Sequence, residues 1–250
     1  MNNTEKIIRI LNILGDFPYE MGLTDIAKDL GAAKGSVHKI LQTMVKGGLL
    51  TKDAARRYRI GPLALRLGGV YKQQNGLWDI VKPVITSLGK VIGETVFLGM
   101  RDADHSFLAY KIAGPKGDYY GNLVAVTFPI NSGSVGKLLA AYQDEDRITS
   151  ILKREKLQKV APNTITDPEL LVREFAKIRE QGYAVSVEEA RVGGVGVSFP
   201  IRNKDNTVNT CIGFALPKIR FDQMDLPSTV NLFSSAADDI SQQLAMRRIG

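Results

Sequence analysis

The sequence predicts an α/β protein of two domains joined by a helix. Residues 1–61 combine helical apolar spacing, a glycine turn and two short strand-like segments, which is typical of a winged helix-turn-helix. Residues 62–78 continue at helical spacing, which indicates a linker helix. Residues 79–250 alternate between helix-like and strand-like segments, which predicts an α/β domain with a mainly antiparallel sheet.

Composition limits the class of protein. The chain has 250 residues, of which 44% are hydrophobic and 24% charged, as in ordinary globular proteins. Its apolar runs end far short of the roughly 20 residues that span a bilayer, and its start lacks the features of a signal peptide. We therefore expect a cytoplasmic protein with no membrane partner. One cysteine, Cys211, and two histidines, His38 and His105, predict no disulfide, no metal site and no cofactor.

The positive charge is concentrated in the first third of the chain. Residues 1–75 hold 12 Lys and Arg against 6 Asp and Glu, whereas residues 76–250 hold 21 against 20. A local cation excess on a small domain is typical of a protein that binds a polyanion such as nucleic acid. A solvated charged face is the plain alternative. An anionic membrane is disfavoured, because the cations do not lie opposite an apolar face of one long helix.

The spacing of apolar residues strengthens the nucleic-acid interpretation. Residues 4–17 read as an amphipathic helix, and two short helices follow around Gly31, where a tight turn needs positive φ. Ala27 is small enough for two helices to cross closely. The second of these helices presents small polar and cationic groups outward, as a recognition helix in the major groove does. These groups are Lys34, Ser36, His38, Lys39 and Gln42. A helical hairpin with a hydrated polar face is the alternative.

A two-stranded wing is predicted after this pair of helices. Leu49–Lys52 and Tyr58–Ile60 are strand candidates joined by a polar turn. Arg56 and Arg57 lie near its tip, where a wing contacts the DNA backbone or the minor groove. A hairpin that only covers the helices is the alternative. The linker helix then has an apolar side, formed by Leu63, Leu67, Val70 and Tyr71, which needs a partner. We expect that partner to be a second copy of the chain.

The C-terminal region contains several predicted helices and strands but no convincing catalytic set. His105 has no Ser or Cys partner at a useful spacing, and the adjacent Glu188 and Glu189 fit a solvated or salt-bridged role. The turn that enters a helix at Ser134–Lys137 has free backbone N–H groups that suit a small anion, although an ordinary loop is as good an interpretation. The chain is therefore predicted not to be an enzyme. We expect helices over 79–92, 134–142, 144–155, 167–181 and 222–248, and strands over 94–101, 105–113, 123–129, 183–188, 195–202 and 208–216.

Five segments resemble the IclR family of bacterial transcriptional regulators, and their order covers essentially the whole chain. They are GLTDIAKDLGAAKGSVHKILQTMVKGGLL, RRYRIGPLALRLG, IGETVFLGMRD, SGSVGKLLAA and GYAVSVEEARVGGVGVSFPI. The resemblance implies a C-terminal GAF-like effector domain and dimers, often dimers of dimers. It also implies an operator in double-stranded DNA whose binding responds to a small organic acid or aromatic metabolite.

The resemblance also implies an effector pocket at a helix start and on the strands that follow. The acid group would lie on backbone N–H groups, and the glycines would leave volume for the rest of the ligand. The implied residues are Ser134, Val135, Gly136, Ser186, Gly194, Gly196, Gly213 and Ala215. At Lys39, where the family usually has Arg, a phosphate contact is favoured over base reading, because Lys lacks the bidentate fork. An enzyme on a GAF-like domain and a DNA-binding protein without a ligand remain the alternatives.

Overall fold

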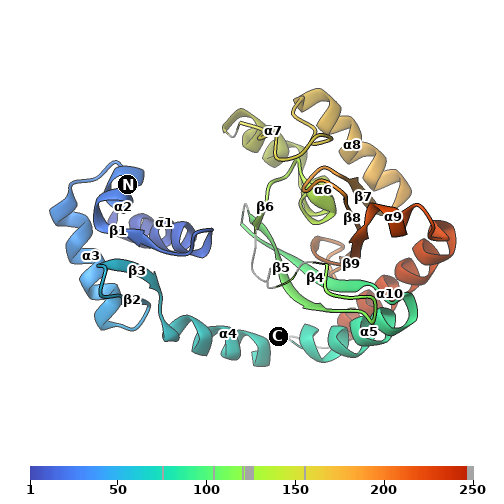
Figure 1. The fold of residues 1–250 in the computed structure, drawn as a ribbon, viewed down its shortest axis with the longest axis horizontal. Helices are drawn as coiled ribbons and strands as arrows, with labels where there is room; N and C mark the ends of the chain where they lie inside the picture. The colour runs from blue at the N-terminus through green and yellow to red at the C-terminus, as the bar shows by residue number, and fades with distance from the viewer. Residues whose placement is uncertain (75, 104, 120, 122–126, 155, 247–250) are drawn as a thin grey trace. The chain divides into compact units, whose positions relative to one another are not determined.

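The structure is a computed structural model, and it divides into two units, Met1–Asn75 and Gly76–Gly250 (Figure 1). It describes all residues except 75, 104, 120, 122–126, 155 and 247–250.

The first unit is a winged helix-turn-helix. The helices are α1 (Asn3–Gly15), α2 (Leu23–Asp29) and α3 (Lys34–Lys46), and the strands are β1 (Met21–Gly22), β2 (Leu50–Lys52) and β3 (Arg57–Ile60). The strands pair antiparallel in the order β1-β3-β2. The first helix is shorter than the predicted 4–17 and starts earlier, because Asn2 and Glu5 form a reciprocal capping box.

The predicted turn and wing are both confirmed. Gly31 adopts φ +58°, a backbone conformation that side chains disfavour, and it separates α2 from α3. Ala27 is buried between the helices, together with Val37 and Leu41 from α3. The wing pairs Leu50 with Ile60, and the buried ring of Tyr58 anchors it to the helices.

Helix α4 (Pro62–Gln74) follows the wing and buries none of its residues. The predicted apolar side is largely exposed to solvent at Leu67, Val70 and Tyr71. Leu65 is also exposed, but two residues along an α-helix correspond to about 200°, so it lies on the opposite side from Leu67 and Leu63.

The second unit is built on a six-stranded antiparallel sheet, which confirms the predicted sheet type. Every neighbouring pair in the order β6-β5-β4-β9-β8-β7 is antiparallel. The strands are β4 (Thr95–Asp102), β5 (His105–Ile112), β6 (Thr127–Phe128), β7 (Ala184–Val187), β8 (Gly194–Arg202) and β9 (Val208–Pro217). Of the strand predicted over 123–129, positions 123–126 lie outside the described residues.

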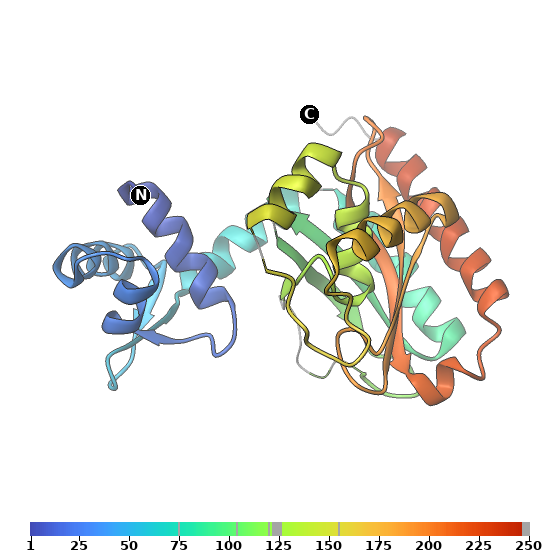
Figure 2. The same cartoon turned by 90° about the horizontal axis from the view of Figure 1, so that it is seen from above.

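Helices cover both faces of this sheet (Figure 2). Helices α5 (Leu77–Ile92) and α10 (Leu226–Met246) pack on one face over an aromatic cluster of Phe199, Phe214 and Phe233. The other face carries α6 (Gly133–Ala141), α7 (Glu145–Arg154) and α8 (Pro168–Gln181). All residues of α6 are buried, so this helix is the centre of its layer.

The last predicted helix, 222–248, is wrong at its start. The short helix α9 (Lys218–Phe221) ends first, and a turn separates it from α10. Asp225 ends that turn by accepting hydrogen bonds from the backbone N–H and the hydroxyl of Ser228. Positions 247 and 248 lie outside the described residues, as does position 155 of the helix predicted over 144–155.

A buried ammonium group fixes α6 in its layer. The Lys137 side chain is 0% exposed, and its Nζ donates to Glu174 Oε1 at 2.7 Å, to Glu189 Oε1 at 2.7 Å and to the Val185 carbonyl at 2.8 Å. These partners belong to α8, to β7 and to the segment after β7. The salt-bridged role expected for Glu189 is therefore present.

The titration of Glu189 affects the stability of the fold. Burial raises the pKa of its carboxyl above the ordinary value, because desolvation outweighs the attraction of Lys137. A carboxyl with a raised folded-state pKa stabilises the folded chain while it is protonated. That contribution is present below the ordinary pKa of unfolded glutamate and is lost as the pH rises through the raised folded pKa.

Two substitutions among Lys137, Glu174 and Glu189 should change the free energy of unfolding in opposite directions. Glu189→Gln keeps an acceptor for Lys137 and removes the titration, so we expect its free energy of unfolding to equal that of the unmodified chain at low pH and exceed it at pH 8. Lys137→Met leaves two carboxylates facing each other without a cation, and we expect a loss of about 3–5 kcal/mol at pH 8. Urea denaturation followed by the fluorescence of Trp78, the chain's one tryptophan, measures both effects.

Lys177 provides the control, because it is an exposed lysine on α8, the helix that also carries Glu174. Lys177→Met should change the unfolding free energy by no more than about 0.5 kcal/mol. If the Glu189→Gln chain is less stable at pH 8 than the Lys177→Met chain, the ionised Glu189 carboxylate does not destabilise the fold, and the proposed effect of its titration is wrong.

Candidate DNA-binding surface and effector pocket

The α3 side chains that were predicted to contact DNA share one accessible surface. Lys34, Ser36, Lys39 and Gln42 are exposed, and His38 is half-buried. The opposite side of α3 is buried through Val37, Ile40, Leu41 and Met44, so the helix can turn only its polar side to a partner. These exposed polar and cationic groups suit the major groove of DNA.

The two wing arginines lie in different surroundings. Arg56 is exposed at the hairpin tip, where its φ of +62° makes the turn between the strands. Arg57 is the first residue of β3, and its guanidinium lies 3.2 Å from a carboxylate oxygen of Glu20. Glu20 also pairs with Arg59, which in turn lies 3.3 Å from Asp53. Arg56 therefore presents its charge outward, while the charge of Arg57 is shared with Glu20.

A pocket opens beside the N-terminus of α6 in the second unit. It has about 380 Å³ of empty space, including its open mouth. Five of the eight predicted effector residues line it, namely Ser134, Val135, Ser186, Gly194 and Gly196. The N-cap residue Ser132 makes no capping hydrogen bond with its side chain, and the first turn of α6, which carries a partial positive charge, lines the pocket through Gly133, Ser134 and Val135.

The other three predicted effector residues do not line this pocket. A Cβ at Gly136 would lie 2.1 Å from the Pro129 carbonyl oxygen, so this glycine allows α6 to approach the preceding chain. Ala215 is buried in the sheet opposite Gly196. The volume expected at Gly213 is absent, because a Cβ there would lie 2.2 Å from the Val197 carbonyl oxygen and 2.6 Å from the Phe97 ring. That correction removes Gly213 as a place for ligand.

Two further side chains that line the pocket, Tyr119 and Arg191, were not predicted from the sequence. The Tyr119 hydroxyl lies 2.2 Å from the position of a Gly194 Cβ, so the phenol fills the space that the glycine leaves. The Arg191 guanidinium stacks on the Tyr119 ring at 4.8 Å, and its Nη1 donates to the Tyr119 carbonyl at 3.4 Å. Arg191 belongs to the same GYAVSVEEARVGG stretch as Ser186 and Gly194, and its charge was the signal available in the sequence. Phe128 adds a second ring to the pocket wall.

The pocket and its surroundings offer little for catalysis or metal binding. His105 is partly exposed with its Nδ1 3.7 Å from Asp102, and it is not among the residues that line the pocket. Burial raises the pKa of the Cys211 thiol to about 12, so it stays protonated. Among the residues that the structure describes, no cluster of three or more His, Cys, Asp or Glu could hold a metal, and no helix is long and apolar enough to cross a membrane.

Comparison with known proteins agrees with this architecture. Residues 4–54 match the IclR helix-turn-helix domain, and residues 70–242 match the bacterial transcriptional regulator IclR C-terminal domain. HTH-type transcriptional regulator KipR of Bacillus subtilis is 26% identical over 245 residues, which cover 97% of this chain and 98% of that protein. HTH-type transcriptional regulator KdgR of Escherichia coli is 27% identical over 240 residues, covering 96% and 91%.

Solved structures agree as well. An IclR transcriptional regulator from Alicyclobacillus acidocaldarius is 28% identical with a TM-score of 0.80, covering 97% of this chain and 98% of that one. An IclR homologue from Microbacterium hydrocarbonoxydans, solved with 4-hydroxybenzoate, shares the fold at 20% identity and a TM-score of 0.76, covering 98% and 100%. The relatives named above are regulators, which confirms the expectation of a regulator in place of an enzyme. The chain belongs to the IclR family of bacterial transcriptional regulators, with an N-terminal DNA-binding domain and a C-terminal effector domain.

Proposed function

We propose that this regulator binds a double-stranded operator through α3 and the wing, and that a small organic acid in the α6 pocket modulates this binding. A bacterial regulator meets its DNA in the cytoplasm, so we propose that location. The observation that carries the effector proposal is the convergence of three features in one pocket. These features are the uncapped start of α6, the guanidinium of Arg191 and the aromatic walls of Tyr119 and Phe128.

The charges in this pocket favour an anionic effector. Lys137 is the cation nearest to Ser134 in the sequence. It is fully buried and forms ion pairs with Glu174 and Glu189, so it does not offer its charge to a ligand. The positive charge offered to a ligand therefore comes from Arg191 and from the first N–H groups of α6. The two rings supply an apolar surface, which favours an acid with an aromatic or short aliphatic body. A relative of the same fold is known with 4-hydroxybenzoate, which supports this class of ligand.

We also propose that the chain works as a homodimer, in which α4 packs against a second copy. No residue of α4 is buried within the chain, although its apolar side carries Leu67, Val70 and Tyr71. Burying such side chains is favourable by roughly 1.5–3 kcal/mol each. A two-fold dimer presents two α3 helices to two half-sites, so we expect a palindromic operator. We further propose that two such dimers pair into a tetramer, and sedimentation distinguishes the two states by mass.

The salt dependence of DNA binding tests the proposed interface. On a random-sequence duplex, Lys39→Ala and Arg56→Ala should each lower the slope of log binding constant against log salt by about one, because each removes a phosphate contact. Arg57→Ala should change the slope less, since Glu20 already shares its charge. Gln42→Ala is the matched control, because it removes an exposed group of the same helix without a charge. Unchanged slopes for both Lys39→Ala and Arg56→Ala would refute the assignment.

The effector pocket is tested by titration calorimetry on the full chain with 4-hydroxybenzoate and, separately, with pyruvate. Arg191→Gln should weaken the binding of whichever acid binds by about tenfold or more, because it removes a charge-assisted hydrogen bond. Arg173→Gln, an exposed arginine on α8, is the control and should change nothing.

Two results would contradict the effector proposal. The first is that neither acid binds. The second is that the amide of a binding acid, which carries no charge, loses as much affinity as the acid does in Arg191→Gln.

Analytical ultracentrifugation tests the proposed dimer by comparing the same substitution, Leu to Glu, at two positions of α4. Leu67→Glu places a charge on the apolar side of α4 and should shift the chain toward monomer at micromolar concentration. Leu65→Glu makes the same chemical change on the opposite side of the helix and should leave the dimer intact. A monomeric unmodified chain, or equal effects of the two substitutions, would count against the proposed packing of α4.

A further inference from the structure

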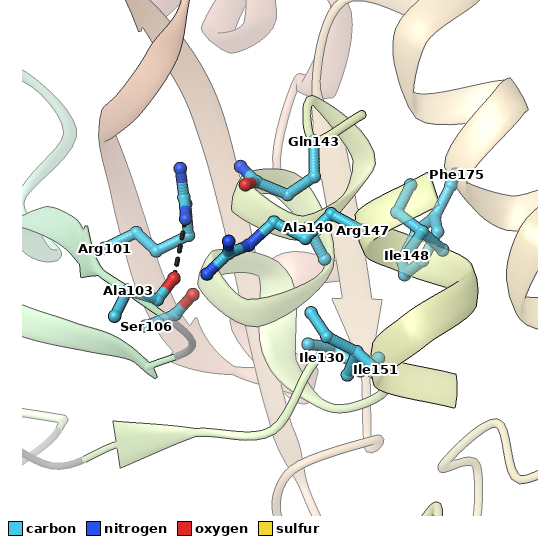
Figure 3. Close-up of a pocket in the computed structure, with 10 residues that line it drawn as sticks. All are labelled: Arg101, Ala103, Ser106, Ile130, Ala140, Gln143, Arg147, Ile148, Ile151 and Phe175. Atoms are coloured by element: carbon cyan, nitrogen blue, oxygen red, sulfur yellow. Dashed lines mark hydrogen bonds between the residues drawn. The ribbon is translucent and has the colours of Figure 1, made fainter. Parts of the chain in front are cut away.

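A small pocket lies at the C-terminal end of α6, beside α7 and the β4–β5 hairpin (Figure 3). Its apolar wall is formed by Ile148 and Ile151 from α7 and by Phe175 from α8. The open space in it holds about one water molecule, which is too little for an organic ligand. A feature that the fold does not explain lies instead on the exposed side of α3.

Gly35 is the second residue of α3, and nothing described in the first unit requires a glycine there. It is exposed, its φ is not positive, and a Cβ built on it would meet no described atom within 4 Å. Gly89 in α5 differs, because a Cβ there would lie 2.7 Å from the Ile112 side chain. Glycine destabilises a helix relative to alanine, since it loses more backbone freedom on folding. The fold of the first unit would therefore be served better by alanine at this position.

Gly35 lies in the middle of the exposed side of α3. Nine residues make about two and a half helical turns, so Gly35 is directly opposite the buried Met44. Lys39, Gln42 and Lys46 are exposed and follow Gly35 at steps of four, three and four residues. Residues at such steps form one ridge along a helix. The ridge that α3 turns outward therefore begins with a position that has no side chain.

The beginning of this ridge is the part of α3 that is expected to contact DNA bases. In a helix-turn-helix protein the second helix lies in the major groove, and its N-terminal residues contact the base edges. In this chain that helix is α3, and Gly35 lies in its first turn. Glycine is commonly used where the backbone must approach a ligand closely. A close contact with DNA therefore explains a glycine that the chain itself does not need.

We propose that Gly35 is a positioning residue for DNA, whose missing side chain lets the first turn of α3 lie directly against the base edges of the major groove. This inference rests on the proposed binding of an operator by α3 and the wing. Lys39 and Gln42 reach the DNA with long side chains, whereas Gly35 sets how deeply α3 enters the groove. A methyl group at position 35 would hold the helix away from the bases and weaken the contacts of its neighbours.

The experiment compares the unmodified full chain with Gly35→Ala and Gly35→Leu. Alanine and leucine are both good helix formers, so neither substitution should lower the melting temperature that circular dichroism measures. The probe is the duplex that the unmodified chain selects from a random-sequence library, and fluorescence anisotropy measures its affinity at about 0.15 M salt. Gly35→Ala should weaken binding by about tenfold, because a methyl group added to a close-packed contact forces the partners apart. Gly35→Leu should weaken it further.

Gly15→Ala is the matched control. Gly15 is an exposed glycine at the end of α1, and a Cβ there also meets no described atom within 4 Å. The same chemical change outside α3 should leave the affinity for the selected duplex unchanged. A loss in Gly15→Ala as large as that in Gly35→Ala would overturn the proposal, because the effect would then not belong to the outward ridge of α3.

Other outcomes separate this proposal from the proposed function. If both Gly35 variants bind the selected duplex as tightly as the unmodified chain, Gly35 does not set the depth of α3, although operator binding stands. If the unmodified chain selects no duplex, operator binding itself fails, and the role of Gly35 falls with it. If Gly35→Leu does not fold, Gly35→Ala decides, because open space surrounds the single methyl group that it adds.

Discussion

The position of α6 in the effector domain depends on the contacts of the Lys137 ammonium group. A charge taken wholly out of water is tolerable only when it is fully compensated, and here two carboxylates and a carbonyl provide that compensation. Because these partners come from separate segments, α6 cannot rotate or slide without breaking them together. The start of α6 is therefore held against β7 and the segment after it, which fixes the wall of the proposed effector pocket at Ser134.

The DNA-binding domain uses charge in a different way. Its cations are exposed, and its acidic residues are placed to hold some of them in position: Glu20 and Asp53 organise Arg57 and Arg59 along the wing. The excess of positive charge is thereby left to α3 and the hairpin tip. Arg57 illustrates that two neighbouring arginines in the sequence need not offer the same charge to a partner. One of them can act mainly within the protein.

Local patterns predicted most of the fold and part of the site. Apolar periodicity and turn glycines located the helix-turn-helix, the wing and nearly every element of the sheet, because these depend on neighbouring residues. The break at Asp225 was missed, since helical spacing continues across it and only the cap reveals it. Gly213 was misassigned because the Phe97 ring that fills its space is distant in the sequence. Tyr119 was not predicted for the same reason, because its place in the pocket depends on a contact with Gly194, which is distant in the sequence.

The contact between Tyr119 and Gly194 has a consequence for how such regulators diversify. The space left by the glycine is occupied by the end of a side chain that belongs to no strand or helix. A mutation at either position changes the shape of the pocket, and one at Tyr119 also changes a ring that packs against the hydrophobic layer around α6. In the proposed effector site, a single substitution at Tyr119 or Gly194 would change ligand preference, while the DNA-binding unit Met1–Asn75 keeps its own separate core.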